Sequence, residues 1–147
     1  MELETFGWDV DGDGIAHAVF DVPGRSMNTL TAKAVADIIA ISKEVASNDA
    51  IKGLVISSGK PSGFCAGADL GEMNQSAGAG KSPADMSEAE LKKAQFDRGF
   101  SLNKTLRELE TCGKPVAVAL NGLALGGGLE VALACHYRVA ANDNPKL

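Results

Sequence analysis

The sequence predicts an α/β protein with a parallel sheet and helical crossovers. Two short, continuous apolar runs, Leu54–Ile56 and Val116–Leu120, are typical of strands that are covered on both faces. A segment with helical periodicity precedes each run, and a glycine-rich loop follows each of them. This order implies right-handed parallel crossovers, and ligands bind at the carboxyl ends of the strands in such sheets. The length of 147 residues fits one domain with a sizeable core.

A β-hairpin is predicted near the N-terminus. Phe6–Val10 and Ile15–Val22 have the character of strands, and the Asp-Gly pairs at 11–14 supply the positive φ angles of a tight turn. The aspartates of this region also match the first half of a calcium-binding loop. Its twelfth position is Phe20 instead of glutamate, and strands flank it, so we expect no calcium there.

A first helix is predicted after the Pro-Gly loop at 23–28, with Asn28 or Thr31 as its N-cap. Its apolar residues recur at steps of three and four and therefore share one face: Leu30, Ala34, Ile38, Ile41 and Val45. Three charged residues fall off this stripe: Lys33, Asp37 and Glu44. The strand Leu54–Ile56 follows, and the loop at 57–70 comes directly after it.

A long second helix is predicted to start at the capping box at 87–90, to run to about Glu110 and to end at Cys112 or Gly113. Its broad apolar stripe comprises Leu91, Phe96, Phe100, Leu102, Leu106 and Leu109. After the strand Val116–Leu120, a third helix begins within the glycine run, and a last short strand is predicted at 137–141.

The segment 74–84 is rich in glycine, alanine and serine and is predicted to be a mobile loop. Its tripeptide at 80–82, Gly-Lys-Ser, resembles the end of a phosphate-binding P-loop. Gln75 stands at the position of the required earlier glycine, and no strand precedes it, so we expect no nucleoside triphosphate to bind there.

The composition favours a soluble protein of the reducing cytoplasm. A net charge of −5 and a pI near 5.0 argue against nucleic acid as a partner. The three cysteines are widely spaced and form no Cys-x-x-Cys pair, so neither a disulfide framework nor a zinc site is indicated. The N-terminus is too acidic for a signal peptide, and no apolar run approaches the roughly 18 residues of a membrane span.

The two glycine- and alanine-rich loops, at 66–68 and 126–128, are the candidate site. Each follows a buried strand, and each can present a backbone N–H to the same ligand oxygen, which would form an oxyanion hole. Such a site serves reactions that build charge on a carbonyl oxygen. Glu130, one helical turn beyond Gly127, could act there as a general base or hold a water.

Each of these features also has a structural interpretation. Glu130 could be a first-turn glutamate that complements the helix dipole, and the glycines at 126–128 could serve close helix–strand packing. The spacing alone favours neither interpretation. Cys65 is interpreted as a small packing residue, and His17 and His136 as structural residues, because none of them has partners at the spacing of a catalytic group.

These two loops make the sequence resemble the enoyl-CoA hydratase/isomerase family, also called the crotonase-like proteins. Phe64–Leu70, with the sequence FCAGADL, is similar to the first oxyanion loop of that family, and Asn121–Glu130, with the sequence NGLALGGGLE, is similar to the second. Both occur in the right order and flank the long helix. The loop at 23–28 resembles the hydratase domain of multifunctional fatty-acid β-oxidation α-subunits.

The resemblance implies a crotonase-like (ββα)n spiral and hydration of trans-2-enoyl-CoA. The N–H groups of Ala68 and Gly127 would bind the thioester oxygen of the acyl-CoA substrate, and Glu130 would be the first of two catalytic glutamates. Residues of the first loop would contact coenzyme A: Ala66, Gly67, Ala68, Asp69 and Leu70. No prosthetic group or metal is implied. The expected partners are further copies of the chain in a trimer-based assembly, or a thiolase if the parent is multifunctional.

The sequence departs from the family pattern mainly in length. The second glutamate would fall just beyond Leu147, and the C-terminal helical segment is absent. We therefore expect residues 1–147 to be the N-terminal part of a single crotonase-like domain, inactive or nearly so by itself. Enoyl-CoA isomerase is the alternative within the family, although its first glutamate position is often not acidic. A non-catalytic CoA-binding or assembly fragment is the alternative of another class.

Overall fold

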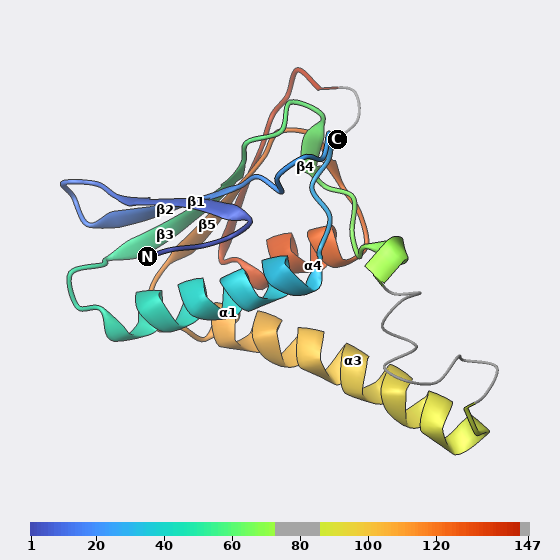
Figure 1. The fold of residues 1–147 in the computed structure, drawn as a ribbon. Helices are drawn as coiled ribbons and strands as arrows, with labels where there is room; N and C mark the ends of the chain where they lie inside the picture. The colour runs from blue at the N-terminus through green and yellow to red at the C-terminus, as the bar shows by residue number, and fades with distance from the viewer. Residues whose placement is uncertain (73–85, 145–147) are drawn as a thin grey trace.

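The computed structural model describes residues 1–72 and 86–144, apart from the side chains of residues 94–95 and 97–100. It is an α/β fold in which three helices lie on one side of a mixed sheet (Figure 1). The sheet has the strand order β1-β2-β3-β5-β7, and a separate two-stranded sheet pairs β4 with β6. The strands are β1 (Phe6–Val10), β2 (Ile15–Phe20), β3 (Gly53–Ser58), β4 (Gly63–Cys65), β5 (Val116–Leu120), β6 (Leu123–Ala124) and β7 (Tyr137–Ala140). The helices are α1 (Ala32–Ser47), α3 (Glu88–Glu110) and α4 (Gly127–Ala134).

The pairing of the strands confirms the predicted topology. β1 and β2 form the antiparallel hairpin, whereas β2–β3, β3–β5 and β5–β7 are parallel pairs. α1 connects β2 to β3, and α3 lies between β4 and β5 in the chain. Parallel neighbours require such crossover connections, and they place the carboxyl ends of their strands at one edge of the sheet. The loops that follow the strands are therefore gathered at that edge.

The helices α1 and α3 begin where side chains satisfy their free N–H groups. Thr31 is the N-cap of α1, because its hydroxyl accepts from the N–H of Ala34 at 3.1 Å. Ser87 and Glu90 form the predicted capping box of α3. Asn28, the alternative cap, is instead a buried tie between segments. Its side chain accepts from Val22 N at 2.9 Å and donates to two further carbonyls, those of Phe20 and Phe64.

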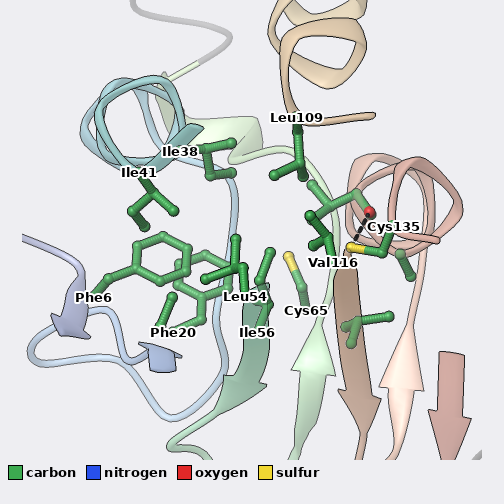
Figure 2. Close-up of a cluster of buried hydrophobic side chains, with 14 of the residues drawn as sticks. Phe6, Phe20, Ile38, Ile41, Leu54, Ile56, Cys65, Leu109, Val116 and Cys135 are labelled. Carbon is green, nitrogen blue, oxygen red and sulfur yellow. Dashed lines mark hydrogen bonds between the residues drawn. The ribbon is translucent and has the colours of Figure 1, made fainter. Parts of the chain in front are cut away.

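The core lies between the sheet and the helices, where the apolar stripe of α1 meets β1, β2 and β3 (Figure 2). Phe6 and Phe20 stack with ring centroids 4.5 Å apart. Ile38 and Ile41 of α1 and Leu109 of α3 are each at most 2% exposed. Full burial of such side chains contributes about 1.5–3 kcal/mol each, so this cluster supplies much of the driving force for folding.

Two predictions about individual residues and one about a loop were wrong or incomplete. Asp37 does not lie on the exposed side of α1: it is buried, and its carboxylate accepts hydrogen bonds from Thr5 N and Thr5 Oγ1, both at 2.7 Å. Phe96, which was predicted to belong to the broad apolar stripe of α3, is 69% exposed. The glycine-rich loop after β3 contains a short strand, β4. The predicted loop at 74–84 and its P-loop-like tripeptide lie outside the described residues.

The hairpin turn explains two of the remaining polar residues. Asp11 Oδ1 accepts from the N–H groups of Asp13 at 3.0 Å and Ile15 at 2.9 Å, and its Oδ2 lies 3.0 Å from His17 Nε2. The hydrogen bond from His17, followed by those from the backbone, lowers the pKa of Asp11. Both side chains are thus engaged in holding the turn.

None of the helices in residues 1–72 and 86–144 combines the length and the apolar character that a membrane span requires.

His136 joins the end of α3 to the start of β5. Its Nδ1 accepts from Val116 N at 2.9 Å, so Nε2 carries the proton and donates to the carbonyl of Glu110 at 3.0 Å. We expect His136→Leu to lower the free energy of unfolding by about 1–3 kcal/mol, because two hydrogen bonds of about 0.5–1.5 kcal/mol each are lost. His17→Leu, which removes only a half-exposed pair, is the control for urea denaturation. Equal losses in the two variants would contradict this role.

Candidate active site

The two predicted loops begin where two paired strands, β4 and β6, end. β4 and β6 are parallel, with Gly63 opposite Leu123 and Cys65 opposite Ala124. Just beyond this pair, Leu125 N donates to the carbonyl of Cys65 at 3.0 Å. Because parallel strands end at the same edge, the chain segments that follow β4 and β6 start side by side. The 66–68 and 125–128 segments therefore face each other across a short distance.

Gly67 shows how close this approach is. A methyl group at Gly67 would lie 2.9 Å from the carbonyl oxygen of Leu125 and 3.6 Å from the backbone nitrogen of Gly127. Its φ angle of +95° is also one that side chains disfavour. Gly128 is similarly constrained, since a methyl group there would lie 2.6 Å from the carbonyl oxygen of Cys65. Glycine is thus required on both sides of the contact between the loops.

The N–H group of Ala68 points away from Leu30, the residue that lies opposite it. Leu30 N donates to the carbonyl of Gly67 at 2.8 Å, and Asp69 N donates to the carbonyl of Leu30 at 3.2 Å. Both bonds are made by the residues that flank Ala68. Because the C=O of Gly67 and the N–H of Ala68 belong to one trans peptide and point in opposite directions, the N–H of Ala68 points away from Leu30. Ala68 itself is an exposed residue.

Gly127 is the first residue of α4, where backbone N–H groups have no intrahelical acceptor. The helix begins after Gly126, whose φ angle is +47°, and the next donor, Gly128 N, bonds to Leu125 O at 2.8 Å. Within residues 1–72 and 86–144, no acceptor is found for the N–H of either Gly127 or Ala68. Two free donors on adjoining loops, one at the positive end of a helix, are suited to hold an anionic oxygen.

Glu130 lies on the first turn of α4 and is exposed. Its Oε2 is 3.9 Å from the position that a Cβ of Gly127 would occupy, so the carboxylate lies close to the first residue of the helix. A carboxylate in this place can take a proton from a ligand bound at the Gly127 N–H. The same place is also that of a glutamate that stabilises the helix dipole. The predicted proximity of Glu130 and Gly127 is present, and both interpretations of Glu130 agree with it.

The other residues of the first loop differ in accessibility. The N–H of Ala66 is used, because it donates to Asn28 O at 2.9 Å. Leu70 is 72% exposed, whereas Asp69 is 6% exposed. The Asp69 carboxylate caps the helical turn at 70–72, accepting from Glu72 N at 2.9 Å. This backbone bond, together with Thr29 and Arg25, lowers the pKa of Asp69, although desolvation opposes the shift.

Several candidate groups lie outside the site. The thiol of Cys65 points into the core (Figure 2), and burial raises its pKa, which agrees with its interpretation as a packing residue. Burial likewise raises the pKa of Cys135 to about 12.

A surface groove lies at the amino ends of β5 and β7, opposite the two loops. It is lined by Glu110, Thr111, Gly113, Lys114, Pro115, His136 and Tyr137.

Two polar residues beside the site could not be found from the sequence. Arg25 forms an ion pair with Asp69, and Thr29 Oγ1 donates to Asp69 Oδ2 at 3.0 Å. Both belong to the loop that leads into α1, some 40 residues before Asp69. Neither forms a motif with Asp69 at a recognisable spacing, and only the fold brings them together.

Comparison with known sequences assigns this arrangement to a family. The profile of the enoyl-CoA hydratase/isomerase family matches residues 11–146. Two curated relatives, from Shewanella amazonensis and Idiomarina loihiensis, are named fatty acid oxidation complex subunit alpha. Each is 40% identical to this chain, over 141 and 143 residues, which cover 96% and 97% of it. The chain spans 18% of the length of these relatives. The predicted similarity to fatty-acid oxidation α-subunits is confirmed.

Solved structures agree with this assignment. An enoyl-CoA hydratase from Bacillus anthracis superimposes with a TM-score of 0.73 at 26% identity, covering 95% of this chain and 48% of that one. An enoyl-CoA hydratase from Shewanella pealeana has a TM-score of 0.77 at 21% identity, covering 95% and 47%, and shows the likeness of the fold. The predicted crotonase-like α/β fold is therefore confirmed.

Proposed function

Because the chain belongs to the enoyl-CoA hydratase/isomerase family, we propose that the protein containing it adds water to trans-2-enoyl-CoA thioesters. The observation that carries this proposal is the pair of free N–H groups on two loops in contact, with a carboxylate one helical turn away. The names of the relatives, which are subunits of a fatty acid oxidation complex, support a substrate of this class.

Ala68 N–H and Gly127 N–H form the proposed oxyanion hole. When water adds to the β-carbon, the electron pair of the double bond moves toward the thioester carbonyl, and its oxygen gains negative charge. Two donors fixed in advance stabilise this charge more than they stabilise the neutral ground state. The close approach of Gly67 to Leu125, together with the hydrogen bond from Leu125 N to Cys65 O, supports a common target for the two donors, since it holds their loops together.

Glu130 is the proposed first carboxylate of the reaction. Together with a second glutamate, it holds the attacking water and takes its proton as the new C–O bond forms at the β-carbon. A carboxylic acid then returns a proton to the α-carbon, which converts the enolate to the neutral thioester product. We propose that residues 1–147 are the N-terminal part of one crotonase-like domain and that the second glutamate belongs to the remainder of this domain.

The coenzyme A part of the substrate is proposed to lie along Ala66–Leu70, where Ala68 and Leu70 are exposed. The thioester is the substrate itself, and the chemistry requires no prosthetic group. The relatives are named as subunits of a complex, so we propose a second subunit, of the thiolase type, as the partner of the parent protein.

The test compares binding and turnover. We expect acetoacetyl-CoA to bind this chain in calorimetry, because the oxyanion donors and the CoA-contacting loop are both within it. We also expect crotonyl-CoA hydration by the complete protein and little or none by the 147-residue chain, which has only one of the two proposed carboxylates.

The outcomes separate the alternatives. Binding with no hydration by the complete protein would favour a non-catalytic CoA-binding or assembly function. Migration of the double bond in a 3-enoyl-CoA without hydration would favour isomerase chemistry at the same oxyanion hole. The proposal as a whole would be overturned if neither binding nor turnover of any acyl-CoA occurred.

A further inference from the structure

Asp69 is joined to the loop before α1 by both its side chain and its backbone. Its Oδ2 accepts from Thr29 Oγ1 at 3.0 Å and is paired with Arg25. Arg25 Nη1 also donates to Thr29 Oγ1 at 3.2 Å, so the side chains of Arg25, Thr29 and Asp69 form a closed ring of polar contacts. Oδ1 accepts from Glu72 N at 2.9 Å. Both carboxylate oxygens are thus used, in a residue that is only 6% exposed.

The backbone on either side of Ala68 is fixed by the same region. The carbonyl of Gly67 and the N–H of Asp69 both bond to Leu30, and Leu30 directly follows Thr29. A rotation of the peptide that carries the Ala68 N–H would break the bond from Leu30 N to Gly67 O. The ring of Arg25, Thr29 and Asp69 prevents the two segments from sliding apart, because a carboxylate deprived of its partners at this burial is costly.

We propose that Asp69, held by Arg25 and Thr29, is a positioning residue that fixes the direction of the Ala68 N–H in the oxyanion hole. The inference rests on the proposed function, since it assumes that this N–H receives the thioester oxygen. Asp69 contacts no reacting atom in this role. Its effect reaches the substrate only through the Ala68 peptide, so it acts on the transition state more than on ground-state binding.

The test uses the complete protein and the variant Asp69→Asn. The amide has a single acceptor oxygen, which can still accept from Glu72 N–H. An NH2 group takes the place of the second oxygen and cannot accept from Arg25 and Thr29, so the ring is broken. We expect kcat for crotonyl-CoA hydration to fall about 10- to 100-fold, less than the roughly 100- to 1,000-fold typical of a deleted donor, while KM changes less than about 3-fold.

A second readout reports the oxyanion hole directly. Butyryl-CoA cannot be hydrated, and a ¹³C label at its thioester carbonyl lets the stretching frequency of the bound molecule be read by difference infrared spectroscopy. Hydrogen bonding lowers this frequency. We expect a clear lowering in the natural protein and a partial return toward the free value in Asp69→Asn. A merely structural residue would not move this frequency in molecules that remain folded.

A milder pair of variants covers the case in which Asp69→Asn fails to fold. Arg25→Met removes the cation of the ring, and Lys33→Met removes a more exposed cation that pairs with Glu4 on the surface. We expect Arg25→Met to lower kcat about 3- to 10-fold and to shift the carbonyl frequency, Arg25→Lys to restore most of both, and Lys33→Met to change neither.

The possible failures are distinguishable. If the natural protein shows no carbonyl shift and no hydration, the oxyanion hole itself is refuted and the positioning role falls with it. If the natural protein shows both, but Asp69→Asn and Arg25→Met keep its kcat and its carbonyl frequency, only the positioning role is overturned.

Discussion

Glu130→Gln in the complete protein is expected to lower kcat for crotonyl-CoA hydration by about 100- to 10,000-fold, the usual contribution of a general acid–base group. Glutamine keeps the size of the side chain but cannot take a proton from water. Binding should change little, because the proposed donors to the thioester oxygen, Ala68 N–H and Gly127 N–H, are backbone groups. The measurements are initial rates with crotonyl-CoA and the affinity for butyryl-CoA.

The same variant decides between the two interpretations of Glu130. A glutamate that serves only the helix dipole contributes about 0.3–1 kcal/mol to stability and nothing to the reaction. Glu108→Gln, on the exposed surface of α3 and paired only loosely with Lys104, is the matched control and should leave the rate unchanged. If Glu130→Gln and Glu108→Gln hydrate crotonyl-CoA equally well, the catalytic role of Glu130 must be abandoned.

The elements that were predicted correctly are those whose signal is local. The strand Val116–Leu120 is five residues of continuous apolar sequence, and the capping box at 87–90 satisfies its own donors within one turn. The hairpin turn at 11–14 is likewise local: Gly14 has a positive φ angle of +83°, although Gly12 does not, and Asp11 accepts from two N–H groups of the turn. Periodicity and capping report local preferences, and here the tertiary structure agrees with them.

Two of the errors concern residues whose partners are distant in sequence. Asp37 looks like an exposed helix residue because periodicity does not register Thr5, which is 32 residues away and supplies two of its donors. β4 has only three residues, and its partner β6 has two, so neither carries a recognisable pattern inside its glycine-rich loop. Pairing across the fold created these features.

The candidate site divides in the same way. Gly67 and the glycines at 126–128 were identifiable because close backbone approach needs glycine wherever it occurs. Arg25 and Thr29 were missed because they are ordinary loop residues until the fold brings them to Asp69. The proposed donors can thus be found from sequence, whereas the groups proposed to orient them cannot.

Gly67→Ala is expected to have the largest combined effect on stability and activity. The variant places a methyl group 2.9 Å from the carbonyl oxygen of Leu125, and it does so at a φ angle of +95°. The conformational strain costs about 1–2 kcal/mol, and overpacking against a backbone atom adds about 1–3 kcal/mol. We therefore expect the free energy of unfolding, measured in urea, to fall by about 2–5 kcal/mol.

Gly113→Ala separates these two causes. Gly113 has a similar φ angle of +83°, but a methyl group there would meet nothing within 4 Å. It should therefore show only the strain of about 1–2 kcal/mol and keep full activity. In Gly67→Ala the 66–68 loop must move away from Leu125, which carries the Ala68 N–H away from that of Gly127. The folded variant should then lose about 100- to 1,000-fold in kcat, the loss expected when one of two oxyanion donors no longer reaches the substrate. Equal stability and activity in the two variants would mean that the loops are not held in contact and that their N–H groups do not act together.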